Sequence, residues 1–400
     1  MKIIKDPVHG DVEVGETALA LLDSPALQRL RHIRQLGFAH LVYPGANHTR
    51  FEHSLGTMHL AAVLCRHLGL DAGESDLVTA AALLHDIGHG PFSHVTEAFM
   101  VEMMGKGHQD AGDLLGEGET AGILEDRGLD PAEVAAVING THRYAGVIHG
   151  DLDVDRMDYL LRDAHYTGVP YGLVDAGRLI RATAGTEYGV ALDASGINAA
   201  ESLLIARTLM RPVVYYHHVS RIATSMFHLA LLSHLEESRE SVGALMRMDD
   251  AALFTRLLAS PDETARDLAR RLYERRLYKR AVYVGRGQVN AAAVQARTSL
   301  AESRQIAREV AEAAGVGEET VLVDIPPFPT DMSMEVRVRE KNALVGLEQV
   351  SPLLTTLNET RREQWRLGVY TLPDQRETVE AAAIEVLHIK KPTQQDRLPV

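Results

Sequence analysis

The stretch from Leu77 to His94 constrains the fold of this chain more than any other segment. It begins with eight residues that carry no charge and continues into three histidines and one aspartate, in the order LVTAAALLHDIGHGPFSH. A buried helix that delivers the adjacent pair His85 and Asp86 must give both polar side chains a partner, because burying them unpaired costs several kcal/mol. A metal ion would serve both, so we predict a metal site at the end of a buried helix.

The composition favours a helical globular protein in a reducing compartment. Of the 400 residues, 46% are hydrophobic and only 5% are aromatic, which is typical of packed helices rich in Ala, Leu, Val and Ile. Cys65 is the single cysteine, so we expect no intrachain disulfide and a cytoplasmic protein. No apolar run approaches the roughly 18 residues of a membrane span. The formal net charge of −14 argues against strong nucleic-acid binding.

Apolar spacing predicts mainly helices in the first part of the chain and a change of pattern near residue 275. We therefore expect a mainly α fold, with a helical core over residues 1–275 and a smaller α+β region over 276–400. Asp76 is expected to cap the helix that leads to His85, and Gly88 and Gly90 to end it. In the C-terminal region, strands are expected at 280–284, 321–325, 334–338 and 382–389, and helices at 290–315 and 345–366.

The remaining metal ligands must come from other segments. Adjacent helical residues project about 100° apart, so a metal shared by His85 and Asp86 lies between their two directions. Candidates for further ligands are His53, on the preceding helix, and one of the five aspartates within residues 151–163. Such mixed nitrogen and oxygen donors suit Mg²⁺, Mn²⁺, Fe²⁺, Ni²⁺ or Zn²⁺, with positions left open for water.

A zinc-protease interpretation of the same stretch is disfavoured. His85 and His89 have the spacing of a His-Glu-x-x-His motif, with Asp86 between them. That motif requires a continuous helix, which Gly88 and Gly90 interrupt, and Asp86 is shorter than the glutamate that acts as base.

Several motifs resemble those of the HD-domain metal-dependent phosphohydrolases. His53, the pair His85-Asp86 and the distant Asp155 match the pattern of that family's metal ligands. The segments at 48–56 (HTRFEHSLG), 85–94 (HDIGHGPFSH), 153–159 (DVDRMDY), 6–10 (DPVHG) and 28–31 (QRLR) are similar to its dNTP triphosphohydrolase branch. The resemblance extends over residues 1–235 and recurs at 275–279. Some members of that branch also carry a SAM domain, which is not expected in these residues.

The resemblance implies an HD-domain core and a role for each matching residue. A divalent metal ion would be bound by His53, His85, Asp86 and Asp155. His94 would be the general acid, and His89 and His108 would complete the polar site beside the α-phosphate. The triphosphate would contact Arg50, Arg156 and Arg207, whereas the sugar would contact Tyr159, Asp163, Gln35 and Tyr215, the last of which would exclude ribonucleotides.

The implied activity is hydrolysis of dNTPs to deoxynucleosides and triphosphate by a homo-oligomer. Two positions depart from the branch, since Arg156 replaces a lysine and Arg211 replaces a histidine near the base. Nucleotide activation is implied by matches at Asp23, Gln28, Arg31, Arg275 and Lys279, although Lys5 replaces an asparagine of that activator site. Two alternatives stay open: a phosphohydrolase or phosphodiesterase that acts on another nucleotide, and a nucleotide-sensing scaffold without catalysis.

Overall fold

The computed structural model describes residues 2–110, 112–150, 152–186, 189–289, 299–329, 332, 336–340 and 343–390. The chain forms two compact units that interleave along the sequence. Unit 1 comprises Met1–Tyr215, Met246–Ala251 and Met332–Leu357, and unit 2 comprises Tyr216–Leu245, Ala252–Asp331 and Asn358–Val400. Because each unit is discontinuous in sequence, the boundary at residue 275 stays a prediction of the sequence alone.

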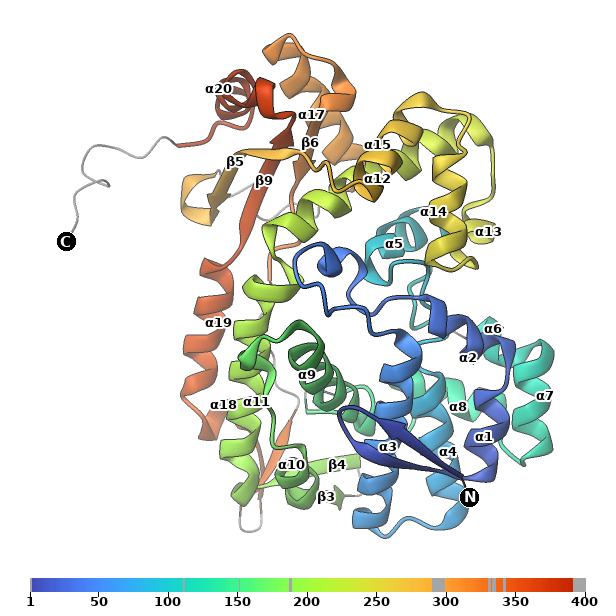
Figure 1. The fold of residues 1–400 in the computed structure, drawn as a ribbon. Helices are drawn as coiled ribbons and strands as arrows, with labels where there is room; N and C mark the ends of the chain where they lie inside the picture. The colour runs from blue at the N-terminus through green and yellow to red at the C-terminus, as the bar shows by residue number, and fades with distance from the viewer. Residues whose placement is uncertain are drawn as a thin grey trace. The chain divides into compact units, whose positions relative to one another are not determined.

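Unit 1 is mainly helical, as the sequence predicted (Figure 1). Its helices are α1 (Glu16–Leu22), α2 (Pro25–Arg29), α3 (Arg50–Leu68), α4 (Ala72–Leu84), α5 (His94–Phe99), α6 (Gly112–Gly116), α7 (Gly118–Asp126), α8 (Pro131–Ile138), α9 (Val154–Thr167), α10 (Ala176–Ala182), α11 (Ile197–Met210) and α18 (Leu347–Val350). Its strands are β1 (Lys2–Asp6), β2 (Gly10–Val14), β3 (Thr183–Thr186), β4 (Gly189–Asp193), β7 (Arg337–Glu340) and β8 (Ala343–Gly346).

Unit 2 combines helices with one antiparallel sheet. It contains α12 (His218–Ser238), α15 (Glu263–Tyr273), α17 (Leu300–Ala314) and α20 (Arg376–Val386), and the sheet has the strand order β5 (Lys279–Gly285), β9 (Arg366–Thr371), β6 (Val321–Asp324). Helices α17 and α20 contact each other, and both contact this sheet. Three further helices each contain residues of both units: α13 (Val242–Met246), α14 (Asp250–Leu258) and α19 (Leu353–Glu363).

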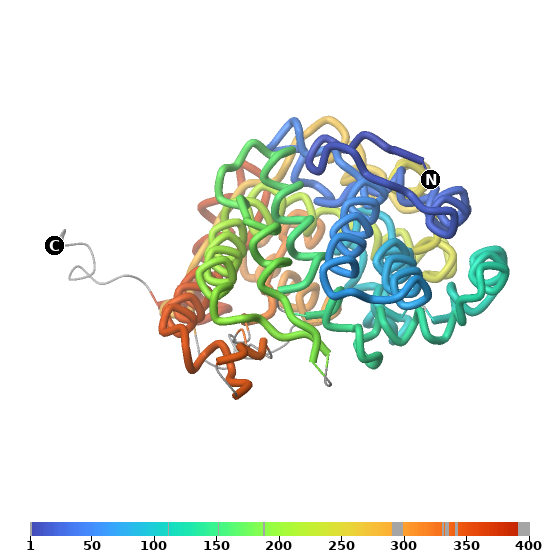
Figure 2. Tube along the Cα trace, turned by 90° about the horizontal axis from the view of Figure 1, so that it is seen from below, coloured from blue at the N-terminus to red at the C-terminus, as the bar shows by residue number. Residues whose placement is uncertain are grey.

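Helices α3 and α4 form the centre of unit 1 and lie side by side (Figures 1 and 2). From Leu77 to Leu84, every residue of α4 except Thr79 is buried, which explains why this stretch is uniformly apolar. The helix begins earlier than predicted. Asp71, not Asp76, is the N-cap, because the Asp71 carboxylate accepts the Glu74 N–H at 2.9 Å while the Glu74 carboxylate accepts the Asp71 N–H at 3.2 Å.

Within the described residues, three small sheets complete the fold. Strands β1 and β2 form an antiparallel hairpin, with Asp6 paired to Gly10 at its turn. A second sheet in unit 1 has the order β3-β4-β7-β8, in which only β4 and β7 run parallel. The sheet of unit 2 is antiparallel throughout its described residues. In the described parts of the chain, the structure contains no helix long and apolar enough to cross a membrane.

The C-terminal predictions were partly wrong. The strands expected at 280–284 and 321–325 are confirmed as β5 and β6. The strand expected at 382–389 is instead the end of helix α20, where Val379, Ala382 and Ala383 are buried at helical spacing. The helix expected at 345–366 is divided at Ser351 into α18 and α19, and the segment after Trp365 is strand β9. Residues 290–298 of an expected helix and residues 334–335 of an expected strand lie outside the described residues.

Candidate metal centre and active site

Three helices of unit 1 bring the four predicted metal ligands together. His53 lies on α3, His85 and Asp86 follow the last residue of α4, and Asp155 lies in the first turn of α9. His53 Nε2 lies 2.9 Å from Asp155 Oδ1 and 3.7 Å from Asp86 Oδ2. His85 Nε2 lies 3.4 Å from Asp86 Oδ1 and 3.7 Å from Asp155 Oδ1. One donor atom from each of His53, His85 and Asp86 therefore lies within 4.8 Å of the others, and Asp155 Oδ1 adjoins both histidine nitrogens.

The second ring nitrogen of each histidine has its own partner. His85 Nδ1 lies 2.8 Å from the Ala82 carbonyl oxygen, and His53 Nδ1 lies 2.7 Å from Asp158 Oδ2. These hydrogen bonds leave both Nε2 atoms directed at the carboxylates. His85 Nε2 is buried and has no hydrogen-bond partner, although buried polar atoms seldom lack one. A divalent metal ion would satisfy it, so the donor set fits such an ion.

The charges of the centre also fit a bound cation. Burial raises the pKa of Asp86, but Arg50, His85 and His89 outweigh it and hold this pKa well below its usual range. Burial likewise raises the pKa of Asp155, but the adjacent His53 and His85 outweigh it and lower this pKa overall. Burial lowers the pKa of His53, yet Asp155 and Asp158 outweigh it and raise this pKa to about 10, so a metal ion would have to displace a proton from this ring. Two ionised carboxylates thus attract positive charge to this point.

Arg50 lies against the metal centre with part of its guanidinium unused. Its Nη1 donates to Asp86 Oδ2 at 2.6 Å, and its Nε donates to Ser93 Oγ at 2.7 Å. Its Nη2 is buried without a hydrogen-bond partner, and the whole residue is only 2% exposed. A buried, unsatisfied cationic donor beside a metal site is suited to an anionic oxygen of a ligand.

A strained turn carries the chain from the metal centre to His94. Phe92 and Ser93 both have φ of 58°, a left-handed conformation that costs roughly 1–3 kcal/mol for such residues. The turn is held in place because Phe92 N–H donates to Asp250 Oδ1 at 2.6 Å and Ser93 Oγ donates to the Arg34 carbonyl at 2.6 Å. His94 then begins α5, beside the metal centre but largely exposed.

The three predicted catalytic histidines form one group next to the metal centre. His89 Nε2 lies 3.3 Å from Asp86 Oδ1, and one ring nitrogen from each of His89, His94 and His108 lies within 4.8 Å of the others. The His89 and His108 rings stack with centroids 3.9 Å apart. Burial and the nearby Arg50 hold the pKa of His89 well below its usual range.

Glu97 joins two of these histidines, and sequence reasoning missed it. Its Oε2 lies 2.7 Å from His94 Nδ1, and its Oε1 contacts His108 Nδ1. Burial raises the pKa of Glu97, but the hydrogen bonds from His108 and His94 outweigh it and lower this pKa. The available signal was its position three residues after His94 on a helix, where the two side chains can meet.

A second polar group surrounds Asp163, one of the predicted sugar-binding residues. Asp163 accepts a hydrogen bond from the Tyr215 hydroxyl at 2.8 Å and contacts His48 Nε2 at 2.8 Å. The Tyr159 and Tyr215 rings meet edge to face, 6.1 Å apart. Gln35 is joined to His48 through the backbone, and its buried Oε1 has no hydrogen-bond partner. The structure thus brings all four predicted sugar-binding residues into one region, together with His48, which was not predicted.

The other two predicted phosphate-binding arginines lie close enough to Tyr159 to affect its pKa. Burial raises the pKa of Tyr159 to about 12, and the positive charges of Arg207 and Arg156 oppose this shift. Arg156 Nη1 donates to the Gly150 carbonyl and to Asp153. The two arginines therefore lie in the region of Tyr159, whereas Arg50 lies at the metal centre.

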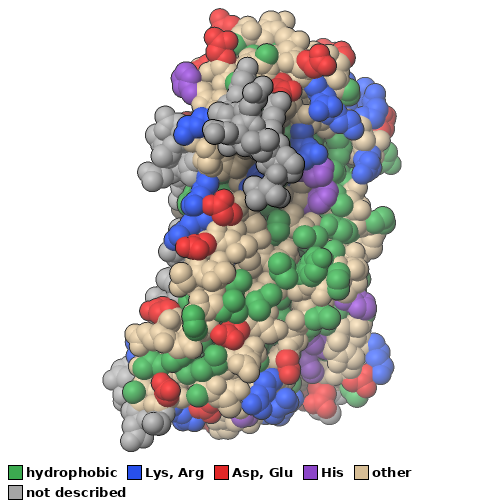
Figure 3. Space-filling model, turned by 90° about the vertical axis from the view of Figure 1, so that its left-hand side faces the viewer, with side chains coloured by type: hydrophobic (Ala, Val, Ile, Leu, Met, Phe, Trp, Pro, Cys, Tyr) green, Lys and Arg blue, Asp and Glu red, His purple; other side chains and the backbone are tan. Residues whose placement is uncertain are grey.

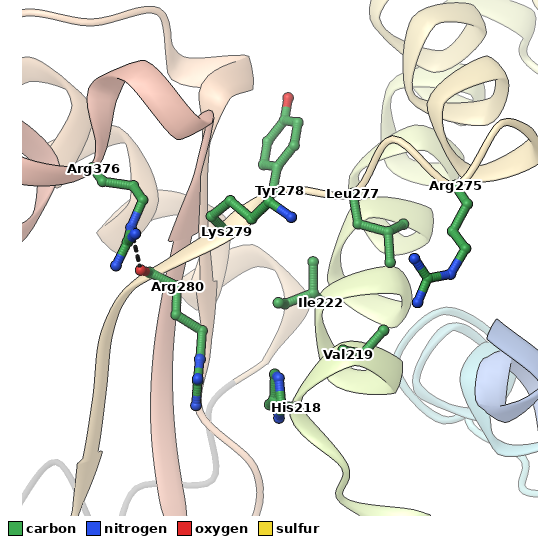
Figure 4. A pocket seen from close by; sticks show the side chains of 9 residues that line it. All are labelled: His218, Val219, Ile222, Arg275, Leu277, Tyr278, Lys279, Arg280 and Arg376. Carbon is green, nitrogen blue, oxygen red and sulfur yellow. Dashed lines mark hydrogen bonds between the residues drawn. The ribbon is translucent and has the colours of Figure 1, made fainter. Parts of the chain in front are cut away.

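The predicted activator residues fall in both units. In unit 1, Asp23 follows α1, Gln28 donates to the Leu22 carbonyl, and Arg31 donates to Gln28 and lies over the Phe51 ring. In unit 2, Arg275 and Lys279 line one pocket of about 260 Å³ (Figure 4). Figure 4 shows Arg275 and Arg280 approaching this pocket from different sides of α12.

Comparison with known proteins identifies the family. A family model for the HD domain matches residues 50–163, which contain all four predicted metal ligands. A second model, for the HD associated region, matches residues 174–398 and therefore more than half of the chain. The chain belongs to the HD-domain phosphohydrolase family. The resemblance indicated by the sequence motifs is confirmed.

Members of this family at moderate identity include proteins with and without a described activity. The chain is 34% identical to an uncharacterized protein of Methanocaldococcus jannaschii over 92% of its own length and 79% of that protein. It is 32% identical to the deoxynucleoside triphosphate triphosphohydrolase SAMHD1 of Gallus gallus over 56% of its own length, and the match covers 44% of that enzyme. A solved structure of a hypothetical protein from Aquifex aeolicus matches with a TM-score of 0.74 at 30% identity, over 95% of this chain and 99% of that chain.

Proposed function

We propose that this HD-domain phosphohydrolase is a metal-dependent dNTP triphosphohydrolase that releases a deoxynucleoside and inorganic triphosphate. One observation carries the proposal: the centre formed by His53, His85, Asp86 and Asp155 lies beside Arg50, whose Nη2 is buried and unpaired. A centre for a divalent cation next to a buried arginine with one unpaired donor nitrogen is suited to a phosphate group. Similarity to a chicken enzyme named for this activity supports the choice of substrate.

Each residue of the site would have a separate role in the reaction. A divalent metal ion bound in the centre would activate water for attack on phosphorus and offset the negative charge of the phosphates. Arg50 Nη2 would donate to an oxygen of the α-phosphate, where negative charge increases in the transition state. His94 would give its Nε2 proton to the departing 5′ oxygen, with its Nδ1 held by Glu97. His89, which is buried, would donate a hydrogen bond to the same phosphate group.

The group around Asp163 supports a preference for deoxynucleotides. Asp163 has hydrogen-bond partners in Tyr215 and His48, and it would accept the 3′-hydroxyl of the sugar. The ring of Tyr215, fixed through its hydroxyl, would lie against the 2′ carbon and leave no room for a 2′-hydroxyl. Arg156 and Arg207, whose charges both act on Tyr159, would contact the outer phosphates.

We include a nucleotide activator in the proposal. The pocket that Arg275 and Lys279 line also contains Arg280 and Arg376, and no carboxylate is among the nine described residues that line it. Burial, and next the charge of Arg280, lower the pKa of His218 in this pocket to about 4. Positive side chains gathered around one pocket are suited to the phosphates of a nucleotide.

We also propose that the protein forms a homo-oligomer and is located in the cytoplasm. Large apolar side chains are exposed, among them Ile205 and Leu209, one turn apart on α11. Figure 3 shows hydrophobic side chains gathered on one face of the molecule. Exposed apolar surface of this kind is typical of protein contacts. The free, buried Cys65 is compatible with a reducing compartment.

A panel of nucleotides tests the proposed function. The purified protein is incubated with each dNTP and NTP in Mg²⁺ or Mn²⁺, with and without GTP, and the products are separated by anion-exchange chromatography. Deoxynucleoside and triphosphate in equal amounts are expected. Orthophosphate or pyrophosphate as product favours a phosphohydrolase of another specificity. Binding of dNTPs without turnover by metal-loaded protein favours a sensing scaffold.

A further inference from the structure

The carboxylate of Asp158 lies behind the metal centre and has no exposure to solvent. Asp158 is three residues after Asp155 on α9, so both face the same side of that helix. Its Oδ2 lies 2.7 Å from His53 Nδ1 and accepts from Arg162 Nε at 2.9 Å. Its Oδ1 lies 2.6 Å from His9 Nε2 and accepts from Arg162 Nη2 at 2.9 Å. These four contacts use the full acceptor capacity of a carboxylate.

The same network reaches the turn of the N-terminal hairpin. Arg162, which is also fully buried, donates from Nη1 to Asp6 Oδ2 at 2.8 Å. The other oxygen of Asp6 accepts the backbone N–H groups of Val8 and His9 at 2.9 and 2.8 Å. A continuous chain of hydrogen bonds therefore joins the turn between β1 and β2 to the side chain of His53.

Gly56 shows that helix α3 is adapted to this network. A Cβ atom at this position would lie 1.9 Å from Asp158 Oδ1 and 2.3 Å from Arg162 Nη2. Gly56 is in the interior of α3 with ordinary helical geometry, where glycine costs roughly 0.5–1 kcal/mol relative to alanine. Glycine at this position therefore leaves space for the ion pair between Asp158 and Arg162, one helical turn from His53.

Stability alone is a weak reason for such an arrangement. A buried ion pair is often no more stabilising than apolar residues of the same volume, because both charges lose their hydration. This pair differs from an ordinary buried salt bridge in one contact, the hydrogen bond between Asp158 and His53 Nδ1. A carboxylate bound to the second nitrogen of a metal-binding histidine fixes its tautomer and ring orientation and strengthens the other nitrogen as a donor.

We propose that Asp158 is a positioning residue that orients His53 as a metal ligand, and that Arg162 and the Asp6–His9 turn hold Asp158 in place. The inference rests on the proposed metal-dependent function. This proposal gives the segment Asp-Pro-Val-His-Gly a specific role, because His9 contacts Asp158 and Asp6 contacts Arg162. The N-terminal hairpin is then part of the metal centre.

Metal affinity of three variants, measured without substrate, tests this role. In Asp158→Asn the contact to His53 loses its charge, and Co²⁺ affinity, measured by competition with a chelator, is expected to fall about 10- to 100-fold. The visible absorption of the Co²⁺-loaded protein should also change, because the ligand field at His53 changes. In His9→Leu one support of Asp158 is lost, so a smaller decrease in affinity is expected.

Asp324→Asn is the matched control. Asp324 makes a bidentate pair with Arg221 inside unit 2, so its loss should lower the thermal midpoint while Co²⁺ affinity stays the same. Unchanged affinity and absorption in Asp158→Asn would overturn the inference. If Asp158→Asn does not fold, unchanged affinity in His9→Leu overturns it instead. Wild-type protein that binds Co²⁺ normally but hydrolyses no dNTP would refute only the proposed function.

Discussion

The imidazole of His94 and the carboxylate of Glu97 form a hydrogen-bonded pair, with 2.7 Å between Nδ1 and Oε2. His94 is 66% exposed at its side chain, whereas Glu97 is mostly covered. An exposed histidine has little else to fix its ring, so Glu97 decides which nitrogen faces the site. The same carboxylate also contacts His108.

Glu97→Gln should therefore reduce catalysis without removing the metal. A glutamine side chain has a single acceptor oxygen for the two histidines, so at least one of the two rings loses its fixed orientation. We expect kcat to fall roughly 100-fold or more, as for loss of a positioned acid, with bound metal unchanged. Glu125→Gln, at an exposed position of α7, is the control and should behave like the wild type. A kcat equal to that of the wild type would contradict a role for Glu97.

Arg50→Lys tests whether the guanidinium, and not charge alone, is needed beside the metal centre. Lysine keeps the charge, but it cannot donate to Asp86, Ser93 and a phosphate oxygen at the same time. We expect kcat/KM to fall by about 100- to 1000-fold, the usual effect of losing one donor in the transition state.

The control for Arg50→Lys is Arg34→Lys, since the Arg34 side chain is partly exposed and its nearest carboxylate oxygen, on Asp250, is 3.9 Å away. Its kinetic constants should stay within about twofold of the wild type, as for most surface substitutions. If both variants retain wild-type kcat/KM, Arg50 does not contact the phosphate.

Tyr215→Ala should weaken the discrimination against ribonucleotides. The ring of Tyr215 is fixed by its hydrogen bond to Asp163, and removing it opens space beside the sugar. The ratio of kcat/KM for ATP to that for dATP should rise roughly tenfold or more, since shape alone discriminates by about this factor. Tyr171→Ala, at an exposed position, should leave the ratio unchanged. An unchanged ratio in Tyr215→Ala would remove the structural reason for a preference for deoxynucleotides.

His218 makes the stability of the protein sensitive to acid. Burial, followed by the charge of Arg280, lowers its pKa to about 4 from an ordinary value of 6.5. Between these values the unfolded chain binds a proton that the folded protein does not, so stability falls as the pH decreases from about 6.5 to about 4. The thermal midpoint of His218→Gln should therefore fall less than that of the wild type over this range. Equal decreases in both proteins would contradict this origin of the acid sensitivity.

The sequence predicted the parts of the site that are encoded in short motifs. His85 and Asp86 are adjacent, and the apolar helix before them indicated that both side chains are buried and need a shared partner. His53 and Asp155 were found because each lies in a motif of its own. The structure brings these four donors together, and their roles in catalysis stay predictions.

The contacts between distant segments could not be predicted in the same way. Asp158 and His9 are 149 residues apart, and nothing in either segment alone indicates that they meet. Glu97 was missed because a glutamate on a polar helix is common. The strand expected at 382–389 was wrong because a short apolar run fits either element, and only burial at the spacing of Val379, Ala382 and Ala383 identifies the helix.

The products formed from dATP by the metal-loaded protein test the central claim most directly. Quantitative anion-exchange chromatography, with and without GTP, should show one deoxyadenosine and one triphosphate for each dATP consumed. His85→Ala combined with Asp86→Ala should abolish this turnover, because both ligands from the end of α4 are lost. Release of pyrophosphate or orthophosphate by the wild type, or equal turnover by the double variant, would contradict the account.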